Sequence, residues 1–267
     1  MRIVGFTKHN TNLKHKDYPY AGEDSFNYYK NRKVIIAVAD GITRSIINMK
    51  NLSEESPAKK AADLFCKSFI RYARKSNSIR NAIIYSNKKI RDLNEGLEVD
   101  YLENDFWACV GIGGVIKNKN LYYGYVADCG VCVFNKKGRL RFKTKNEGPN
   151  SKGSIDKDIR KKFKTSFEEP EGKVLIRSRY RNNPKEPLSY GAFTGEKNVF
   201  HFLRTGSFKL HKEDYVLFYS DGISPIISSK RFNVSKCFDS LEEYFDKKLN
   251  KIDGSEGTLV AVTLGDD

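Results

Sequence analysis

Four aspartates of the sequence stand beside or within apolar segments, where a charged side chain is unexpected. Asp40 ends the most apolar segment of the chain, and Asp221 ends a second apolar segment. Asp24 precedes an aromatic segment, and Asp128 lies inside an apolar one. A carboxylate at the edge of a hydrophobic core is costly unless it is paired or binds a cation. We therefore expect these four aspartates to meet around a cation.

The chemical type of these candidate ligands indicates which cation. They offer only oxygen atoms, with no supporting His or Cys, and this favours Mg²⁺ or Mn²⁺ over Zn²⁺. Asp40 and Asp221 are each followed by glycine, Gly41 and Gly222, which permits a tight turn and leaves a backbone carbonyl free as a further ligand. The alternative is that each Asp-Gly pair only makes a turn. Two such pairs, joined by two further half-buried acids, favour the metal cluster.

Cysteine and histidine chemistry is less favoured. Cys129 and Cys132 have the spacing of a redox motif, but they lie within the strand-like run 121–134, so buried strand cysteines are the preferred interpretation. The four histidines show no ligand spacing. An odd number of cysteines with no apolar leader after the first residues predicts free thiols in a reducing cytoplasm. These cysteines are Cys66, Cys109, Cys129, Cys132 and Cys237.

Composition excludes several classes of protein. The chain has 267 residues, a formal net charge of +15 and 12% aromatic residues, which is too aromatic for a disordered coil. No apolar run approaches the ~20 residues of a membrane span, so we expect no membrane partner. The lysines are scattered, and their densest cluster, 157–164, predicts one face of a surface helix. A dedicated nucleic-acid surface is therefore less favoured. The basic stretch 177–183 fits a phosphopeptide contact and a solvated loop equally well.

The pattern of apolar residues predicts many strands and few helices. A helix begins at Ser56 and Pro57, where Ser caps it and Pro occupies its first turn. Glycines 111, 113 and 114 mark close packing between sheets. We expect strands at 2–7, 25–29, 34–39, 106–116, 121–134, 139–143, 208–210, 215–219 and 258–264, and further helices at 79–97, 155–167, 223–228 and 240–248. This order favours packed sheets with helices outside them.

The acidic segments also resemble a known family, the type 2C metal-dependent protein phosphatases. The resemblance covers almost the whole chain, and its motifs occur in the family's order and near its spacing. They are Gly22-Glu23-Asp24-Ser25, Val38-Ala39-Asp40-Gly41, Tyr125-Val126-Ala127-Asp128-Cys129, Tyr219-Ser220-Asp221-Gly222, and the supporting segments 190–195, 205–208, 213–217 and 258–262.

This resemblance implies a single domain over residues 1–267 with an α+β fold. In the family, two stacked antiparallel sheets are flanked by helical pairs, giving a β-sandwich in α/β/β/α layers. A cleft at one end holds two or three Mn²⁺ or Mg²⁺ ions, which activate a water to attack the phosphorus of a phosphoserine or phosphothreonine. The implied protein is a cytoplasmic serine/threonine protein phosphatase. Its partners would be phosphorylated proteins, with a cognate kinase as an open further partner.

The resemblance also implies roles for single residues. Asp40, Asp221 and Asp24 would form the catalytic metal centre: Asp40 bridges two metals and Asp221 binds the second. The carbonyl of Gly41 would bind one ion. Glu23, like Asp24, would hold metal-bound water. Asp128 would stand where bacterial members add a third metal.

This sequence departs from the family pattern at several positions, among them Ile42 in place of a His and Gly130 in place of an Arg. The last metal-binding aspartate of the family is Ser255 here, and Glu256 or Asp253 would substitute for it. No arginine precedes the Glu-Asp pair, so Lys14, Lys16 or Arg44 would have to contact the substrate phosphate, and Lys does so less well than Arg. The alternative is a pseudophosphatase, a regulatory binding module with this fold and weak or no turnover. A basic nucleic-acid-binding module is a third, less favoured hypothesis.

Overall fold

Two five-stranded antiparallel sheets form the centre of the molecule. The structure is a computed structural model that describes residues 1–8, 22–42, 56–102, 104–167, 169–249 and 256–265. One sheet has the order β1-β10-β9-β6-β7, and the other has the order β2-β3-β4-β5-β8. Their bounds are β1 Arg2–Lys8, β2 Ser25–Lys30, β3 Val34–Gly41, β4 Cys109–Lys117, β5 Asn120–Val126, β6 Gly130–Phe134, β7 Leu140–Lys143, β8 Arg204–Lys209, β9 Tyr215–Tyr219 and β10 Gly257–Thr263.

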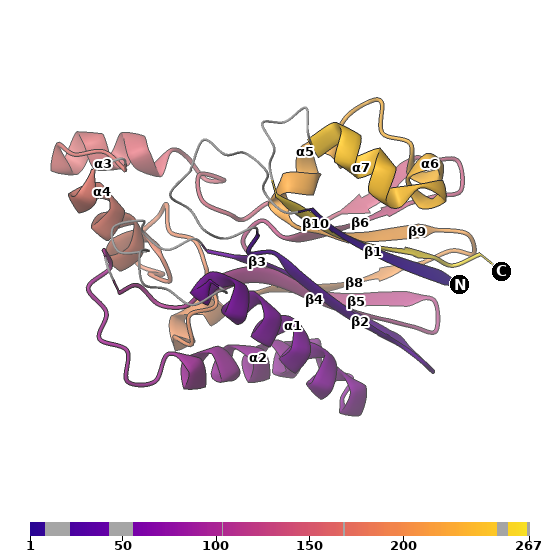
Figure 1. Cartoon of the computed structure of the whole chain (residues 1–267), viewed down its shortest axis with the longest axis horizontal. Helices are drawn as coiled ribbons and strands as arrows, with labels where there is room; N and C mark the ends of the chain where they lie inside the picture. The colour runs from indigo at the N-terminus through magenta and orange to yellow at the C-terminus, as the bar shows by residue number, and fades with distance from the viewer. Residues whose placement is uncertain (9–21, 43–55, 103, 168, 250–255, 266–267) are drawn as a thin grey trace.

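Helices cover the outer faces of both sheets (Figure 1). The helices α1 (Pro57–Lys75) and α2 (Ile79–Leu93) lie along the sheet that contains β2, β3 and β4. The helices α5 (Ser224–Ile227), α6 (Val234–Asp239) and α7 (Leu241–Leu249) lie over the other sheet. This arrangement confirms the predicted α+β sandwich in α/β/β/α layers. None of the helices in the described residues combines the length and apolarity needed to cross a bilayer.

A long connection between β7 and β8 carries α3 (Ile155–Phe163), α4 (Pro170–Leu175) and a π-helical turn (Ile176–Tyr180). A short 3-10 turn at Lys197–His201 follows, and another, at Asp221–Ile223, follows β9. The helices α3 and α4 stand at the end of the sandwich away from the chain termini (Figure 1). The predicted basic helix face at 157–164 is confirmed, since α3 is a surface helix.

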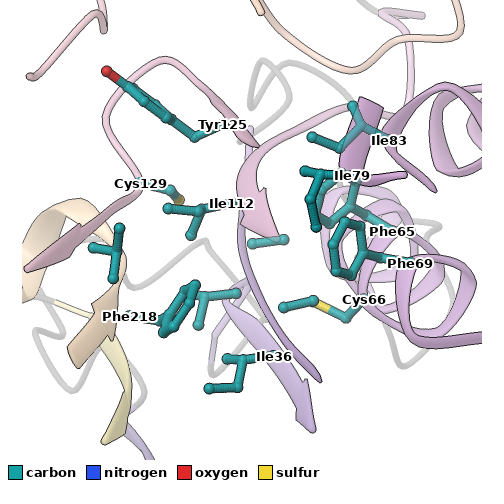
Figure 2. Packing of buried hydrophobic residues seen from close by; sticks show 14 of the residues in the cluster. Ile36, Phe65, Cys66, Phe69, Ile79, Ile83, Ile112, Tyr125, Cys129 and Phe218 are labelled. Atoms are coloured by element: carbon teal, nitrogen blue, oxygen red, sulfur yellow. The ribbon is translucent and has the colours of Figure 1, made fainter. Parts of the chain in front are cut away.

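The local sequence explains why α1 begins where it does. Ser56 Oγ accepts the N–H of Lys59 at 2.9 Å, and Pro57 occupies the first turn, as predicted. Phe65 and Phe69 then recur on one face, and both are fully buried. Figure 2 shows these two rings with Ile79 and Ile83 of α2 on one side of the sheet, and Ile112, Ile36 and Phe218 on the other.

Glycines in β4 allow both α1 and the opposite sheet to pack close to this strand. A Cβ atom on Gly113 would lie 2.2 Å from the Phe69 ring, and one on Gly114 would lie 2.5 Å from the Phe218 ring. Phe69 belongs to α1 and Phe218 to the opposite sheet, so the strand is tightly packed on both faces. The predicted close packing at these glycines is confirmed, and it involves a helix as well as the second sheet.

The predicted strand 121–134 was wrong in one respect, because it is two strands in different sheets. The strand β5 ends at Val126 and β6 begins at Gly130. Between them Ala127 has φ +67°, a left-handed conformation that few residues other than glycine adopt. Asp128 therefore lies in the turn that carries the chain from one sheet to the other, and not within a strand.

Two of the predicted helices were also too long at their C-terminal ends. The second helix ends at Leu93 and not at 97, since the side chain of Asn94 bonds to the backbone of Trp107. The helix predicted at 155–167 ends at Phe163, because Lys164 has φ +59°. The helices α4 and α6 and the π-helical turn were not predicted.

Only part of the basic stretch 177–183 is exposed, at Ser178 and Arg179, so the predicted solvated loop does not describe its arginines Arg177 and Arg181. Arg181 is buried and forms a two-pronged ion pair with Asp105, with N–O distances of 2.6 and 2.9 Å. Arg177 Nε lies 3.0 Å from the same carboxylate. These two arginines therefore attach the long connection to the segment before β4 rather than meeting solvent or a peptide.

We predict that Phe65→Ala lowers the free energy of unfolding by about 3–5 kcal/mol, because it leaves a cavity between α1 and the sheet. The matched variant Phe167→Ala removes the same atoms from a side chain that is 46% exposed, and should cost less than about 1 kcal/mol. Urea unfolding followed by circular dichroism measures both. Equal losses in the two variants would contradict this packing.

Candidate metal centre

The acidic residues converge because the strands that carry them end or begin at the same end of the sandwich. In one sheet Ser25 pairs with Ala39, which puts Asp24 beside Asp40 one step further on. In the other sheet Gly130 pairs with Tyr219, so Asp128 and Asp221 both lie just beyond this last pair at the same end of the sheet, and the charge of Asp221 acts on Asp128. The sequence thus forms two acid pairs, one at the end of each sheet.

A hydroxyl group joins the two sheets at this end. Ser220 Oγ donates a hydrogen bond to Asp24 Oδ2 at 2.6 Å and accepts the N–H of Thr258 at 2.9 Å. Ser220 follows β9, whereas Asp24 precedes β2 of the opposite sheet. Ser220 belongs to one of the motifs that resemble the family, but the sequence predicts no role for its side chain. Its contact with Asp24 spans 196 positions of the chain, and no local pattern indicates it.

Burial and mutual repulsion disfavour the charged form of these acids. Burial raises the pKa of Asp40 well above its usual range, and the charges of Asp24, Asp221, Asp128 and Glu256 raise it further. The pKa of Asp24 is also raised well above its usual value, first by burial and then by Glu256. Five carboxyl groups therefore share one electrostatic site.

Asp128 is held against the loop that follows β7. A Cβ atom on Gly148 would lie 2.4 Å from Asp128 Oδ2, so only glycine permits this approach. The N–H of Glu147 bonds to the carbonyl of Ala127 at 2.9 Å, which fixes the same turn. Burial, followed by the charge of Asp221, raises the pKa of Asp128 to about 6.

Glu256 reaches the same site from the start of β10. Its Oε1 accepts the backbone N–H groups of Glu23 and Asp24, both at 2.6 Å. Burial raises its pKa to about 7 although these two hydrogen bonds oppose the shift. The structure therefore brings Glu256, one of the two predicted substitutes for the missing aspartate, to the candidate centre.

Glu23 is oriented by the N-terminus of α1. Ser56 Oγ donates to Glu23 Oε1 at 2.6 Å while it caps the helix by accepting the N–H of Lys59. Lys59 Nζ in turn donates to the carbonyl of Asp24 at 2.6 Å. The sequence predicted the cap but not its second bond, so it missed Ser56 as a residue of this site.

The two glycines after Asp40 and Asp221 are needed for space. A Cβ atom on Gly41 would lie 2.8 Å from the backbone of Ala58, and one on Gly222 would lie 1.8 Å from the carbonyl oxygen of Glu256. Among the described residues, neither glycine has a positive φ. Close backbone contact, and not a left-handed conformation, therefore accounts for glycine at these two positions.

The residues present suit a hard cation. Burial raises the pKa of the Cys129 and Cys109 thiols, and nearby carboxylates raise it further, so these side chains are not thiolate ligands. In the parts of the chain that the structure describes, no Lys or Arg forms an ion pair with the side chain of Asp24, Asp40, Asp128 or Asp221. Uncompensated carboxylate oxygens are donors that Mg²⁺ and Mn²⁺ accept.

The described side chains do not form a complete set of metal ligands. Within the described ranges no three His, Cys, Asp or Glu side chains are arranged as a ready metal-binding group. The hydroxyl of Ser56 donates to Glu23 and that of Ser220 donates to Asp24, so two of the carboxylates are held in place by hydrogen bonds.

Several predicted site residues lie outside the described residues. They are the candidate phosphate contacts Lys14, Lys16 and Arg44, the departing position Ser255, and the second candidate substitute Asp253.

The fold is shared with solved bacterial phosphatases. A serine/threonine phosphatase of S. agalactiae is 16% identical, with a TM-score of 0.58 over 99% of this chain and 99% of that chain. The catalytic domain of the serine/threonine protein phosphatase PstP, solved with two manganese ions, is 14% identical, with a TM-score of 0.60 over 98% of this chain and 96% of that one. RsbX, solved with magnesium, is 13% identical, with a TM-score of 0.55 over 98% and 94%.

These likenesses confirm the fold that the resemblance implied, that of the type 2C phosphatases. No family model and no curated protein matches the sequence itself.

The raised pKa of Asp128 predicts a pH-dependent stability. A carboxyl group whose pKa is raised on folding destabilises the folded state once it ionises, so this cost grows as pH rises from about 4 to above 6. In chelator, Asp128→Asn should therefore stabilise the protein more at pH 8 than at pH 5, by about 1 kcal/mol.

Urea unfolding at the two pH values measures this difference. The control Asp239→Asn changes an exposed aspartate of α6 and should give the same change in stability at both. A pH-independent effect of Asp128→Asn would contradict the shared electrostatic site.

Proposed function

We propose that this protein hydrolyses phosphoserine and phosphothreonine on proteins with the help of Mn²⁺ or Mg²⁺. The observation that carries the proposal is the meeting of five carboxyl groups at one end of a phosphatase fold, where burial and neighbouring charges raise the pKa of Asp24, Asp40, Asp128 and Glu256. Two of the solved proteins named above are serine/threonine phosphatases, one of them with two manganese ions.

The residues of the site have separate tasks in this proposal. Asp40 and Asp221 would hold two cations between the sheets, with the carbonyl of Gly41 as a further oxygen. Glu23, Asp24 and Glu256 would orient the coordinated water through their hydrogen-bonded carboxylates, and Asp128 would hold a third ion. Bound there, the cations would supply a more acidic water and would neutralise charge on the phosphoryl oxygens.

Substrate contact remains a prediction for residues outside the described ranges. Lys14, Lys16 and Arg44 are the candidates to bind the phosphate. Phosphoproteins are the proposed substrates, and a kinase that modifies them is a further proposed partner. The five free cysteines, all buried, support the proposed reducing cytoplasm.

One observation favours a second candidate, a pseudophosphatase that binds a phosphoprotein without turnover. The described residues do not form a ready group of three metal ligands, and Ser255 stands where the family has an aspartate. Such a protein would keep the fold and lose the reaction.

Hydrolysis assays separate these two candidates. With Mn²⁺, the protein should hydrolyse p-nitrophenyl phosphate and phosphoserine and phosphothreonine peptides, and chelator should abolish the reaction. Asp40→Asn and Asp221→Asn should each lower kcat/KM at least about 100-fold, which corresponds to about 2.7 kcal/mol of transition-state stabilisation.

The control is Asp239→Asn, an exposed aspartate on α6, which should keep wild-type activity. Folded protein that binds Mn²⁺ but shows no turnover would favour the pseudophosphatase. Activity that survives both site variants would refute the assigned centre.

A further inference from the structure

A pocket lies at the end of the sandwich opposite the acidic residues. It has a volume of about 440 Å³ and lies between the β2–β3 turn, the β4–β5 turn and the segment before β9. In Figure 1 this is the end at which the two termini lie. Strand register places it there, because Val34 pairs with Ile116 at this end while Asp40 pairs with Val110 at the other.

The lining of this pocket is strongly basic. It includes Arg32, Lys33, Lys117, Lys119 and Lys212, and no Asp or Glu is among the described residues that line it. The two acidic residues that follow Lys212 form ion pairs with other residues. Glu213 pairs with Lys136 at 2.5 Å, and the buried Asp214 pairs with Arg141.

Two of these cations, Lys33 and Lys117, lie close enough for their charges to interact. Lys33 Nζ donates to the carbonyl of Ser76 at 3.1 Å and to Asn77 Oδ1 at 3.2 Å, which fixes the side chain against the end of α1. Burial, followed by the positive charge of Lys117, lowers the pKa of Lys33. An anion placed between these side chains would relieve the repulsion that they now share.

The turn that carries Lys117 and Lys119 is tight. Asn118 has φ +50° and Lys119 has φ +58°, so both central residues of the β4–β5 hairpin are left-handed, as in a type I′ turn. Asparagine commonly adopts this conformation and lysine does so less often. The turn thus presents the Lys119 side chain from a backbone with a fixed conformation.

The pocket is suited to phosphate groups and not to stacked bases. Its volume is within the range of small-ligand sites, roughly 300–1,000 Å³. Its floor includes the buried residues Val34 and Ile116, and no Phe, Tyr or Trp is among its described lining residues. Single-stranded nucleic acids usually bind through aromatic stacking as well as charge, so this lining favours a compact polyanion.

We propose that this pocket binds a small ligand that carries two or more adjacent phosphate groups. The ligand would place its phosphates between Arg32, Lys33, Lys117 and Lys119, and the amides of Asn31 and Asn118 would donate further hydrogen bonds. This site is separate from the acidic centre and needs no divalent cation.

Isothermal titration calorimetry of the full chain in chelator tests the proposal. Inorganic triphosphate should bind, whereas inorganic monophosphate should bind at least tenfold more weakly. Arg32→Gln/Lys119→Gln should weaken triphosphate binding at least tenfold. The matched control Lys157→Gln/Lys161→Gln removes the same charge from exposed positions of α3 and should change the affinity less than twofold. Circular dichroism checks that both variants are folded.

Further arms identify the source of the phosphates. A nucleoside triphosphate that binds more tightly than inorganic triphosphate, while the bare nucleoside does not bind, would indicate a nucleotide; equal affinities would indicate a polyphosphate. A neighbouring hollow of about 310 Å³ shares Lys117 and Asn118 with this pocket and includes the exposed Tyr122. A nucleoside attached to the phosphates would contact this hollow, whereas inorganic triphosphate would not.

The proposal would be overturned if triphosphate did not bind, or if both double variants weakened its binding equally. Binding that Asp40→Asn abolishes in chelator would also overturn it, because the ligand would then occupy the acidic centre.

Discussion

Repulsion among buried carboxylates is the constraint on which the rest of this structure depends. Burial and then the charge of Glu256 raise the pKa of Asp24, burial and then the charge of Asp24 raise that of Asp40, and burial raises the pKa of Asp128 to about 6 and that of Glu256 to about 7. Only bound protons or a cation can relieve such a site near neutral pH. The surrounding sandwich must be stable enough to hold these groups together, and its strands are packed on both faces by Phe69 and Phe218.

The antiparallel register turns distant sequence positions into neighbours. Pairing of Ser25 with Ala39 and of Gly130 with Tyr219 brings one acid pair to the end of each sheet, and the bond from Ser220 to Asp24 joins the two ends. The opposite end carries the reverse charge, with lysines and an arginine around a pocket. The charged residues are therefore unevenly distributed, and the candidate centre is an acidic region in a protein whose formal net charge is +15.

The sequence was most informative where a charged residue interrupts an apolar strand. Asp40 and Asp221 were predicted to lie at strand ends because their apolar runs are unambiguous, and the cap at Ser56 was predicted because its chemistry is local. The break at Ala127 was missed, since a left-handed alanine leaves no pattern in the sequence. The buried ion pair of Arg181 with Asp105, 76 residues apart, and the second bond of Ser56 were missed because they depend on tertiary packing.

The central proposal is that divalent cations occupy this acidic site, and diffraction tests it most directly. Crystals soaked in Mn²⁺ and measured at the manganese absorption edge should show two anomalous peaks about 4 Å apart, one on each side of Asp40 and one of them bound by Asp221. Manganese that is absent from this end of the sandwich, or that is bound there without Asp40, would contradict the account.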